Sequence, residues 1–325
     1  MRVGVVGLGV MGQNHARILA DMGILSCVSD ISPEAAKKVA DRYSVPCHGS
    51  HSDLLKGDLD AVVIVTPTAT HKDIATDAIK AGKHVLLEKP MTGSSDALKE
   101  LVDMAEREGV VLAGGFVERH NPVVSVAKKG LQAGDYGELI TAATRRVSSM
   151  PSRIKDVGVV MDLGIHDIDV IQHVVDQEVR SVYAIAGQGS GIPFEDHANL
   201  LMDFDGGATG FVEVNWLTPM KVRKLALTCS KNFVEVDYMD QSVQICSSSF
   251  KPYEPGNTFI VPMEFDLRRV ALRKEEPLRR ELSDFVAAVE KGKDPLVPGG
   301  SAIKTLRIAE AALRSVRSGN KEPVK

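Results

Sequence analysis

The stretch VGVVGLGVMGQNHARILADMG, residues 3–23, joins a short apolar strand, a loop with glycines at positions 7, 9 and 12, and a helical pattern. In such a unit the first glycine permits a tight turn, the second lets the backbone approach a diphosphate, and the third lets the helix pack against the strand. The helix N-terminus, with its N–H groups and positive dipole end, favours a bound phosphate. The residues expected to bind a dinucleotide here are Gly7, Leu8, Gly9, Val10, Met11 and Gly12.

An acidic residue stands at the position that this loop requires. Asp30 comes directly after the next apolar run, residues 24–29. It follows Gly9 by 21 residues, close to the usual spacing of about 20. A carboxylate there accepts hydrogen bonds from the adenosine ribose and repels a 2′-phosphate. Ser32, directly before Pro33, is the better candidate to cap the following helix. The spacing therefore predicts a nicotinamide cofactor and favours NAD over NADP.

Strands and helices alternate through the first third of the chain. Apolar, strand-like runs at residues 2–6, 24–29, 61–65, 84–87 and 110–114 are separated by helical patterns. This alternation predicts an α/β fold with a doubly wound parallel sheet that is covered on both faces. We expect the cofactor-binding domain to span residues 1–119.

The pattern changes after residue 120. Helical patterns at residues 123–131 and 157–175 precede a series of strand-like runs between residues 179 and 246, and two helices, at about residues 275–290 and 301–317, close the chain. This order predicts an α+β domain, residues 120–325, with an open and mostly antiparallel sheet that binds the substrate.

The open face of that sheet is expected to need a cover. The alternating residues Val212, Val214 and Trp216 are expected to lie on it. A second copy of the chain would bury them, which predicts a homo-oligomer.

Composition excludes several classes of protein. The 325 residues are 44% hydrophobic and 25% charged, with a formal net charge of −4, whereas a nucleic-acid binder would carry a basic excess. There is neither a signal-peptide pattern nor a run of about 18 apolar residues, and the four cysteines form no CxxC pair. We therefore expect a soluble, cytoplasmic protein that binds neither nucleic acid nor membrane.

Polar residues follow two of the expected parallel strands, at the edge where open parallel sheets bind ligands. A lysine between a buried strand and a proline is expected to point its ammonium into the ligand cleft, which favours a functional role for Lys89. A threonine at the start of the next helix could equally be a helix cap. The expected cofactor contacts at this edge are Thr66, Pro67, Thr68, His71, Glu88 and Lys89.

The expected helix 157–175 carries a second candidate group. At 100° per residue, Asp162, His166 and Asp169 fall within a sector of roughly 60° opposite the apolar face. Asp162 and His166 are one turn apart beside Gly164, which would thin the helix where a substrate approaches. Asp169 could orient the imidazole or be a surface acid, and Asp167 projects toward the apolar side without an evident role.

Two other chemistries find little support. The chain has no HxxxH motif or cysteine pair to complete a metal-coordination shell, so no metal is expected. No serine lies in a GxSxG elbow, which argues against a serine hydrolase.

Three motifs together resemble the Gfo/Idh/MocA family, which is named for glucose-fructose oxidoreductase and inositol dehydrogenase. They are the glycine loop, Glu88-Lys89-Pro90, and DLGIHDID at residues 162–169; residues 115–122 also resemble the family's loop between domains. The resemblance implies a Rossmann domain, an open-faced α/β domain, bound NAD(H) or NADP(H), homodimers or homotetramers, and a Lys89–Pro90 bond that can be cis.

A catalytic assignment follows from the chemistry of alcohol oxidation. A base must remove the hydroxyl proton while hydride leaves for the nicotinamide, and His166, with an ordinary pKa of about 6.5, suits that role. Lys89 would stabilise the developing alkoxide, and Asp162 would hold the substrate hydroxyl or position His166. The resemblance assigns lysine, aspartate and histidine to the same positions.

The substrate is inferred from a closer resemblance. The segments FEDH (194–197), EVNWLTP (213–219) and EPL (276–278) resemble family members that oxidise the C3 hydroxyl of UDP-N-acetylglucosamine, giving a ketone for a following aminotransferase. Arginines before the catalytic helix could bind the diphosphate or be ordinary edge-strand and loop charges; the one tryptophan could stack on a base or belong to the core. The candidate substrate contacts are Arg119, Asn121, Arg145, Arg146, Arg153 and Trp216.

Two alternatives stay open. The substrate could be a free polyol such as myo-inositol, which needs no phosphate-binding arginines. The chain could also be a non-catalytic NAD(H) sensor, for which the glycine loop and Asp30 would suffice; the presence of Lys89, Asp162 and His166 argues against this reading.

Overall fold

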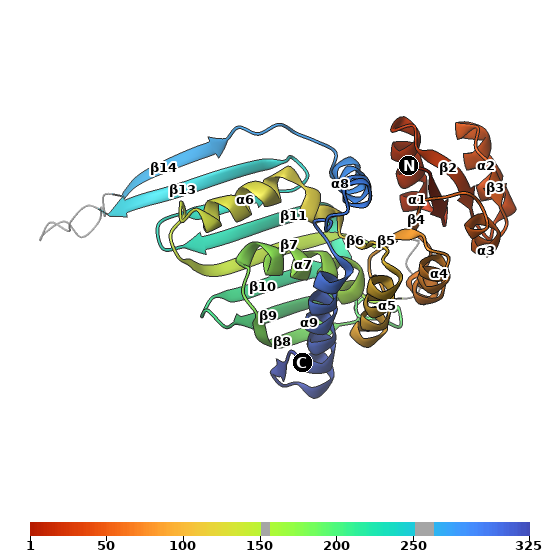
Figure 1. Ribbon diagram of the computed structural model, residues 1–325. Helices are drawn as coiled ribbons and strands as arrows, with labels where there is room; N and C mark the ends of the chain where they lie inside the picture. The colour runs from red at the N-terminus through yellow and green to blue at the C-terminus, as the bar shows by residue number, and fades with distance from the viewer. Residues whose placement is uncertain (151–156, 251–262) are drawn as a thin grey trace, which may run out of the picture. The chain divides into compact units, whose positions relative to one another are not determined.

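The chain forms two compact units in a computed structural model that describes residues 1–150, 157–250 and 263–325 (Figure 1). The first unit consists mainly of Met1–His120 and Glu275–Glu310, and the second mainly of Asn121–Ser152, Gly158–Lys274 and Ala311–Lys325. No helix within these described residues is both long and apolar enough to cross a membrane.

The first unit is built on a six-stranded parallel sheet with the order β3-β2-β1-β4-β5-β6. This is the doubly wound order, with its reversal between β1 and β4, and it confirms the predicted fold. The strands are β1 (Val3–Val6), β2 (Leu25–Ser29), β3 (Cys47–His48), β4 (Ala61–Ile64), β5 (His84–Glu88) and β6 (Leu112–Gly115). The helices of this region are α1 (Val10–Asp21), α2 (Pro33–Tyr43), α3 (His51–Leu55), α4 (Thr68–Lys80) and α5 (Ser95–Glu108), followed by a 3-10 turn, η1 (Val117–His120).

Local sequence explains where these helices begin and end. Ser32 caps α2 by accepting the N–H of Ala35 at 3.3 Å, as the sequence predicts. Ser94 caps α5 in the same way through the N–H of Ala97. Gly109 ends α5 with a φ of 67°, a left-handed conformation that glycine adopts without a steric cost.

The first unit also takes in one of the closing helices. Leu278, Leu282 and Phe285 of α8 (Pro277–Lys291) lie in the same buried cluster as Val3 and Val5 of β1. The division expected from sequence, residues 1–119 and 120–325, assigns α8 to the second domain and so differs from these units. The apolar stripe of α8 is buried in the core of the first unit, and the last helix, α9 (Gly299–Ser318), contributes residues to both units.

The second unit contains a nine-stranded sheet with the order β14-β13-β12-β11-β7-β10-β9-β8-β15. One pair, β7 with β10, is parallel, and the other neighbours are antiparallel. Helices α6 (Pro122–Gln132) and α7 (Ile165–Val175) lie over one face (Figure 1). The strands are β7 (Leu139–Ser149), β8 (Val179–Gly187), β9 (His197–Phe204), β10 (Thr209–Asn215), β11 (Leu217–Cys229), β12 (Phe233–Asp237), β13 (Ser242–Phe250), β14 (Met263–Val270) and β15 (Glu322–Pro323).

The helices cover the face of this sheet that was expected to be open. Val212 and Val214 are 0% and 1% exposed, and Trp216 just beyond β10 is 1% exposed, so all three belong to the core. Since side chains alternate across a strand, Phe211 and Glu213 lie on the other face. The expectation that Val212, Val214 and Trp216 need a partner chain to cover them is therefore wrong.

Two adjacent arginines on β7 show the same alternation. Arg146 is 2% exposed, and its Nε donates to Asp167 Oδ2 of α7 at 2.7 Å, with Nη2 3.4 Å from Oδ1. The Arg146 guanidinium also lies 5.5 Å from the centre of the Tyr238 ring. Arg145 is on the outer face and pairs with Glu213 at 3.0 Å. The Arg146–Asp167 pair therefore holds α7 on the sheet and gives Asp167 a structural role.

We expect Arg146→Ala to lower the free energy of unfolding by about 3–5 kcal/mol, because it removes the cation that pairs with the buried Asp167 carboxylate. The matched change Arg145→Ala removes an exposed pair and should cost about 1 kcal/mol or less. Urea unfolding of the full chain measures both. Equal losses in the two variants would show that the buried pair does not stabilise the fold.

Candidate functional site

The glycine loop has the geometry of a diphosphate cradle. Gly7 has a φ of 91°, and a Cβ there would lie 2.7 Å from the Val65 carbonyl oxygen. A Cβ on Gly12 would lie 1.9 Å from the Gly7 carbonyl oxygen, whereas a Cβ on Gly9 would meet no atom within 4 Å. Two glycines are thus required by close packing, and Gly9 leaves open space above the loop.

Helix α1 presents its N-terminus to that space. Its N-cap residue is Gly9, no side chain caps it, and its first turn carries no acidic residue. Val10 is 67% exposed beside it. These features suit a bound anion. Leu8 is 2% exposed and its side chain packs in the core, so any contact that it makes with the cofactor would come from its backbone.

Asp30 joins the glycine loop to the start of α2. Its Oδ2 accepts the N–H of Leu8 at 2.7 Å, and its Oδ1 accepts the N–H of Ser32 at 2.8 Å. A carboxylate oxygen has two lone pairs, so each oxygen can accept one more hydrogen bond from a ribose hydroxyl. The position and partners of Asp30 fit its expected role beside an adenosine ribose.

The segment after β4 is only partly available to a ligand. Thr68 is the first residue of α4, and the N-cap is Pro67 rather than a threonine. The Thr66 hydroxyl accepts a hydrogen bond from Thr70 at 2.8 Å. His71 is 1% exposed, with Nδ1 2.8 Å from the Pro90 carbonyl and Nε2 2.8 Å from the Thr66 carbonyl. His71 therefore fixes the surrounding loops, and the cofactor contact expected from it is not supported.

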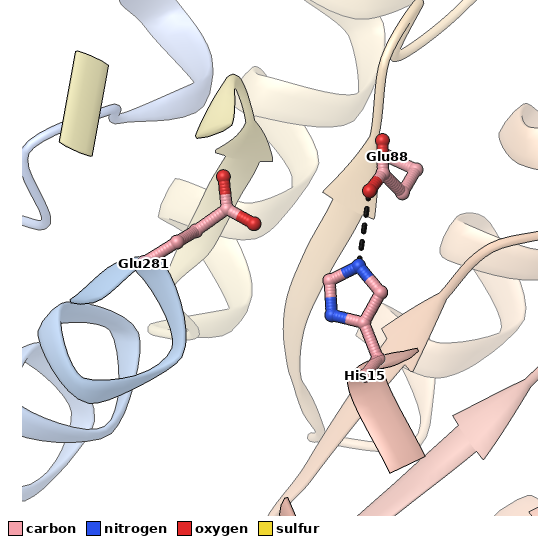
Figure 2. A group of neighbouring side chains, drawn as sticks. All are labelled: His15, Glu88 and Glu281. Atoms are coloured by element: carbon pink, nitrogen blue, oxygen red, sulfur yellow. Dashed lines mark hydrogen bonds and ion pairs between the residues drawn. The ribbon is translucent and has the colours of Figure 1, made fainter. Parts of the chain in front are cut away.

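The segment after β5 rests on a buried contact between a carboxylate and an imidazole (Figure 2). Glu88 is 7% exposed, and its Oε1 lies 2.9 Å from Nε2 of His15 on α1. Its Oε2 accepts the backbone N–H of Lys89 at 3.0 Å. The pKa of Glu88 is lowered despite the opposing effect of burial, because His15 and Lys89 favour its charged form. Glu88 is thus a support for Lys89, whose bond to Pro90 is cis.

Sequence reasoning missed His15 and Gly115. His15 lies on the apolar stripe of α1 with Ile18, Leu19 and Met22, and a polar residue at such a position indicates a buried partner. A Cβ on Gly115 would lie 3.0 Å from the Glu88 Cα and 3.2 Å from its Cδ, so glycine there makes room for the Glu88 carboxylate.

In the second unit, Asp162 and His166 stand on either side of a helix junction. Asp162 lies in a π-helical turn, η2 (Val160–Gly164), and His166 lies in the first turn of α7. Asp162 is 6% exposed, and His166 is half-buried. π-turns inside helices are frequent at functional sites. The structure thus brings these two predicted residues into one turn of chain.

The surroundings of this turn differ from expectation in two respects. Gly164 is buried, and a Cβ there would lie 3.7 Å from the Val214 side chain, an ordinary contact. It faces the sheet rather than an approaching substrate. Asp169 is 1% exposed, so it is not a surface acid.

Most of the expected substrate contacts have structural partners. Arg119, 7% exposed, donates to the Ser301 hydroxyl at 3.3 Å within the first unit. Asn121 caps α6 and donates to the Tyr238 carbonyl at 3.2 Å. Trp216 is a core residue. Arg153 lies outside the described residues.

The two expected diphosphate-binding arginines of β7 do not lie together. Arg145 is exposed on the outer face of the sheet, and Arg146 is buried against Asp167 on the covered face. No single diphosphate can meet both side chains across the sheet.

Comparison with known proteins agrees with this architecture. Residues 1–116 match the model of the oxidoreductase family with an NAD-binding Rossmann fold, and residues 124–235 match the GFO/IDH/MocA C-terminal domain. UDP-N-acetylglucosamine 3-dehydrogenase from Acidithiobacillus ferrooxidans is 30% identical over 95% of both chains. The scyllo-inositol 2-dehydrogenase (NAD(+)) of Bacillus subtilis is also 30% identical, over 98% of this chain and 95% of its own. The solved structure of the A. ferrooxidans enzyme superposes with a TM-score of 0.87, at 27% identity and 98% coverage of each chain.

The first unit is thus an NAD-binding Rossmann domain, and its residues fit the cofactor. The open space above Gly9 and the uncapped start of α1 can take the diphosphate. The remaining lone pairs of Asp30 can take the ribose. The expectation of NAD as cofactor is confirmed.

We expect Gly9→Ala to fold with unchanged or slightly higher stability, since the φ of −62° at this position suits alanine and its Cβ meets no protein atom. The methyl group would occupy the space that the diphosphate needs, so NAD affinity should fall at least about tenfold, or about 1.4 kcal/mol. Calorimetric NAD titration, with urea unfolding in parallel, measures both effects.

Gly49→Ala is the matched control, because a Cβ at Gly49 also meets no atom within 4 Å. It should change neither stability nor NAD affinity appreciably. A Gly9→Ala protein that binds NAD like the wild type would remove the glycine loop from the diphosphate site.

Proposed function

Because the chain belongs to the Gfo/Idh/MocA family of oxidoreductases, we propose that it oxidises a secondary hydroxyl of a sugar with NAD, and that the hydroxyl is C3 of UDP-N-acetylglucosamine. The observation that carries the substrate assignment is the similarity to UDP-N-acetylglucosamine 3-dehydrogenase, which extends over nearly the whole chain in sequence and in structure. The product is a 3-keto nucleotide sugar, and its ketone is the group on which an aminotransferase would act.

In this proposal His166 accepts the proton of the substrate hydroxyl. A half-buried imidazole in the first turn of a helix retains access to a ligand, and histidine is the side chain that most often serves as a general base. Asp162, one turn earlier, orients either the imidazole or the hydroxyl. NAD, when bound, supplies the hydride acceptor.

Lys89 is proposed to stabilise negative charge on the substrate oxygen. Its backbone N–H is held by Glu88, and Glu88 in turn by His15, so the residue projects from a rigid support. A preorganised cation stabilises an alkoxide more effectively than a mobile one, because it needs no reorganisation during the reaction.

A free polyol is the second candidate, and one observation favours it. The similarity to scyllo-inositol 2-dehydrogenase (NAD(+)) equals that to the nucleotide-sugar enzyme, at 30% identity. The burial of Arg146 also removes one of the arginines expected to bind a diphosphate. A non-catalytic NAD(H) sensor would need neither Lys89 nor His166.

We also propose that the chain forms a homo-oligomer through the uncovered sheet face of the second unit. Strand register places Leu201 beside Phe211 on that face, away from Val212 and the helices. Exposed apolar residues on the same face include Ile185, Leu201, Phe233 and Leu267. A partner chain would bury them.

The deciding experiment is NADH formation with NAD and UDP-N-acetylglucosamine, with myo-inositol, scyllo-inositol and glucose in parallel and a ketone trap present. We expect NADH with the nucleotide sugar alone, and product analysis then identifies the oxidised carbon. NADH with an inositol alone would keep the reaction and replace the substrate. NAD binding without turnover of any substrate in a wide sugar panel would favour the sensor.

Lys89→Ala and His166→Ala should each lower kcat by about 10²–10⁴-fold while NAD still binds, because the diphosphate and ribose contacts lie elsewhere. Lys80→Ala, an exposed change at the end of α4, is the control and should leave kcat as in the wild type. Wild-type turnover in both Lys89→Ala and His166→Ala would refute the assigned roles.

A further inference from the structure

Glu281 of α8 is a buried acid without a hydrogen-bond partner. It is 1% exposed, and neither of its carboxylate oxygens has a partner among the described residues. Its neighbours on the same helix, Leu278, Leu282 and Phe285, pack in the apolar core of the first unit. An ionised carboxylate in such surroundings is strongly disfavoured.

Glu281 points toward His15 and Glu88 (Figure 2). One side-chain nitrogen or oxygen from each of these three residues lies within 4.8 Å of the other two, a separation that one intervening water molecule can bridge. His15, Glu88 and Glu281 are called the buried cluster below. His15 Nδ1 is also buried without a partner, so the cluster has hydrogen-bonding capacity on the side that faces Glu281.

The hydrogen bonds within the buried cluster decide where its negative charge resides. Glu88 accepts from both His15 and the Lys89 N–H, and these donors stabilise its ionised form. Glu281 has no such donor, and two ionised carboxylates this close would repel each other. Burial, the charge of Glu88 and the charge of Asp284 all raise the pKa of Glu281.

The other titratable groups around Glu281 do not offset this. Asp284 and His120 line the same small cavity as Glu281. Asp284 adds negative charge, and burial lowers the pKa of His120 to about 4, so this imidazole is neutral at neutral pH. Arg119 and Arg280 lie close enough to His120 to lower its pKa, but among the described residues the charges that act on the pKa of Glu281 are those of Glu88 and Asp284.

We propose that Glu281 is a positioning residue: as a neutral carboxylic acid it completes the hydrogen bonding of the buried cluster and thereby holds Glu88 against the backbone of Lys89. It leaves Glu88 as the single negative charge of the cluster. An effect of Glu281 on kcat rests on the proposed function, because it requires Lys89 to act in the reaction. The protonation state of Glu281 does not depend on the proposed function.

A divalent cation is the competing explanation for the same three residues. They form the one group of His, Cys, Asp or Glu among the described residues whose ligating atoms lie this close together. Each oxygen of Glu88 already accepts one hydrogen bond, from His15 or from the Lys89 N–H, and keeps one further lone pair. A cation bound by Glu88 would compete with these bonds, so the geometry favours a proton.

The first test is urea unfolding of the apoprotein between pH 5.5 and 8.5 for the wild type, Glu281→Gln and Glu290→Gln. Folded wild type retains a proton on Glu281 that the unfolded chain loses above its ordinary pKa of about 4.3. Rising pH therefore destabilises the wild type, by up to tenfold in the folding equilibrium constant per pH unit. Glutamine carries no such proton, so Glu281→Gln should become progressively more stable than the wild type as pH rises.

Glu290→Gln makes the same chemical change at an exposed position of α8 and should follow the wild type at every pH. A constant offset between Glu281→Gln and the wild type across the pH range would overturn the neutral acid. So would a stoichiometric divalent metal in the purified wild type that is lost in Glu281→Gln.

The second test separates positioning from simple packing by comparing Glu281→Leu with Glu281→Gln. Leucine fills the site without a polar atom, so Glu281→Leu should be at least as stable as the wild type at pH 8. Its kcat should nevertheless fall by about tenfold to hundredfold, as for a small misplacement of a reacting group, with little change in the KM for NAD. Glu281→Gln, which keeps the hydrogen bonding, should restore most of the loss.

Full kcat in a stable Glu281→Leu protein would overturn the positioning role while leaving the dehydrogenase assignment intact. If no sugar is turned over by the wild type, the proposed function fails instead. The pH dependence of unfolding then still decides the state of Glu281, because it needs neither cofactor nor substrate.

Discussion

The close approach of helix α1 to the end of β1 is the constraint on which the first unit depends. The 1.9 Å between a Cβ on Gly12 and the Gly7 carbonyl oxygen admits only a hydrogen at that point. This approach places the uncapped start of α1 beside the open space above Gly9, where a diphosphate can bind. One turn further along, the same placement sets His15 against Glu88 at the end of β5. The cofactor loop and the support of Lys89 are thus two consequences of how one helix is seated.

Each unit contains a buried pair of polar side chains that joins a helix to a sheet. In the first unit His15 and Glu88 connect α1 to β5, and in the second Asp167 and Arg146 connect α7 to β7. Buried pairs add little net stability, because desolvation offsets most of the attraction. Their effect is directional: a wrong register would leave a charge buried without its partner. Both pairs lie beside proposed catalytic residues, Lys89 and His166, where precise placement matters most.

The sequence was sufficient for features that depend on local geometry. The alternation of strands and helices, the close packing at Gly7 and Gly12 and the Ser32 cap all follow from residues close together in the chain, and the structure confirms them. Features that depend on distant partners were not predictable. The alternation at Val212 and Val214 shows that β10 has two different faces, but not which face the helices cover. Likewise, the apolar residues of α8 have the spacing of an amphipathic helix, and this spacing does not show which of the two units buries them.

The buried charges illustrate the same limit at the candidate site. Arg145 and Arg146 are equivalent in sequence as candidates for a diphosphate, and only the position of Asp167 on α7 commits Arg146 to the core. Recognition of a nucleotide diphosphate in this chain would therefore have to use cations other than Arg146. Removing a proton and a hydride from a secondary alcohol is the same chemistry in a nucleotide sugar and in a polyol, so the residues proposed for that chemistry do not choose between the two substrates. The proposed catalytic residues and the proposed substrate therefore need separate evidence.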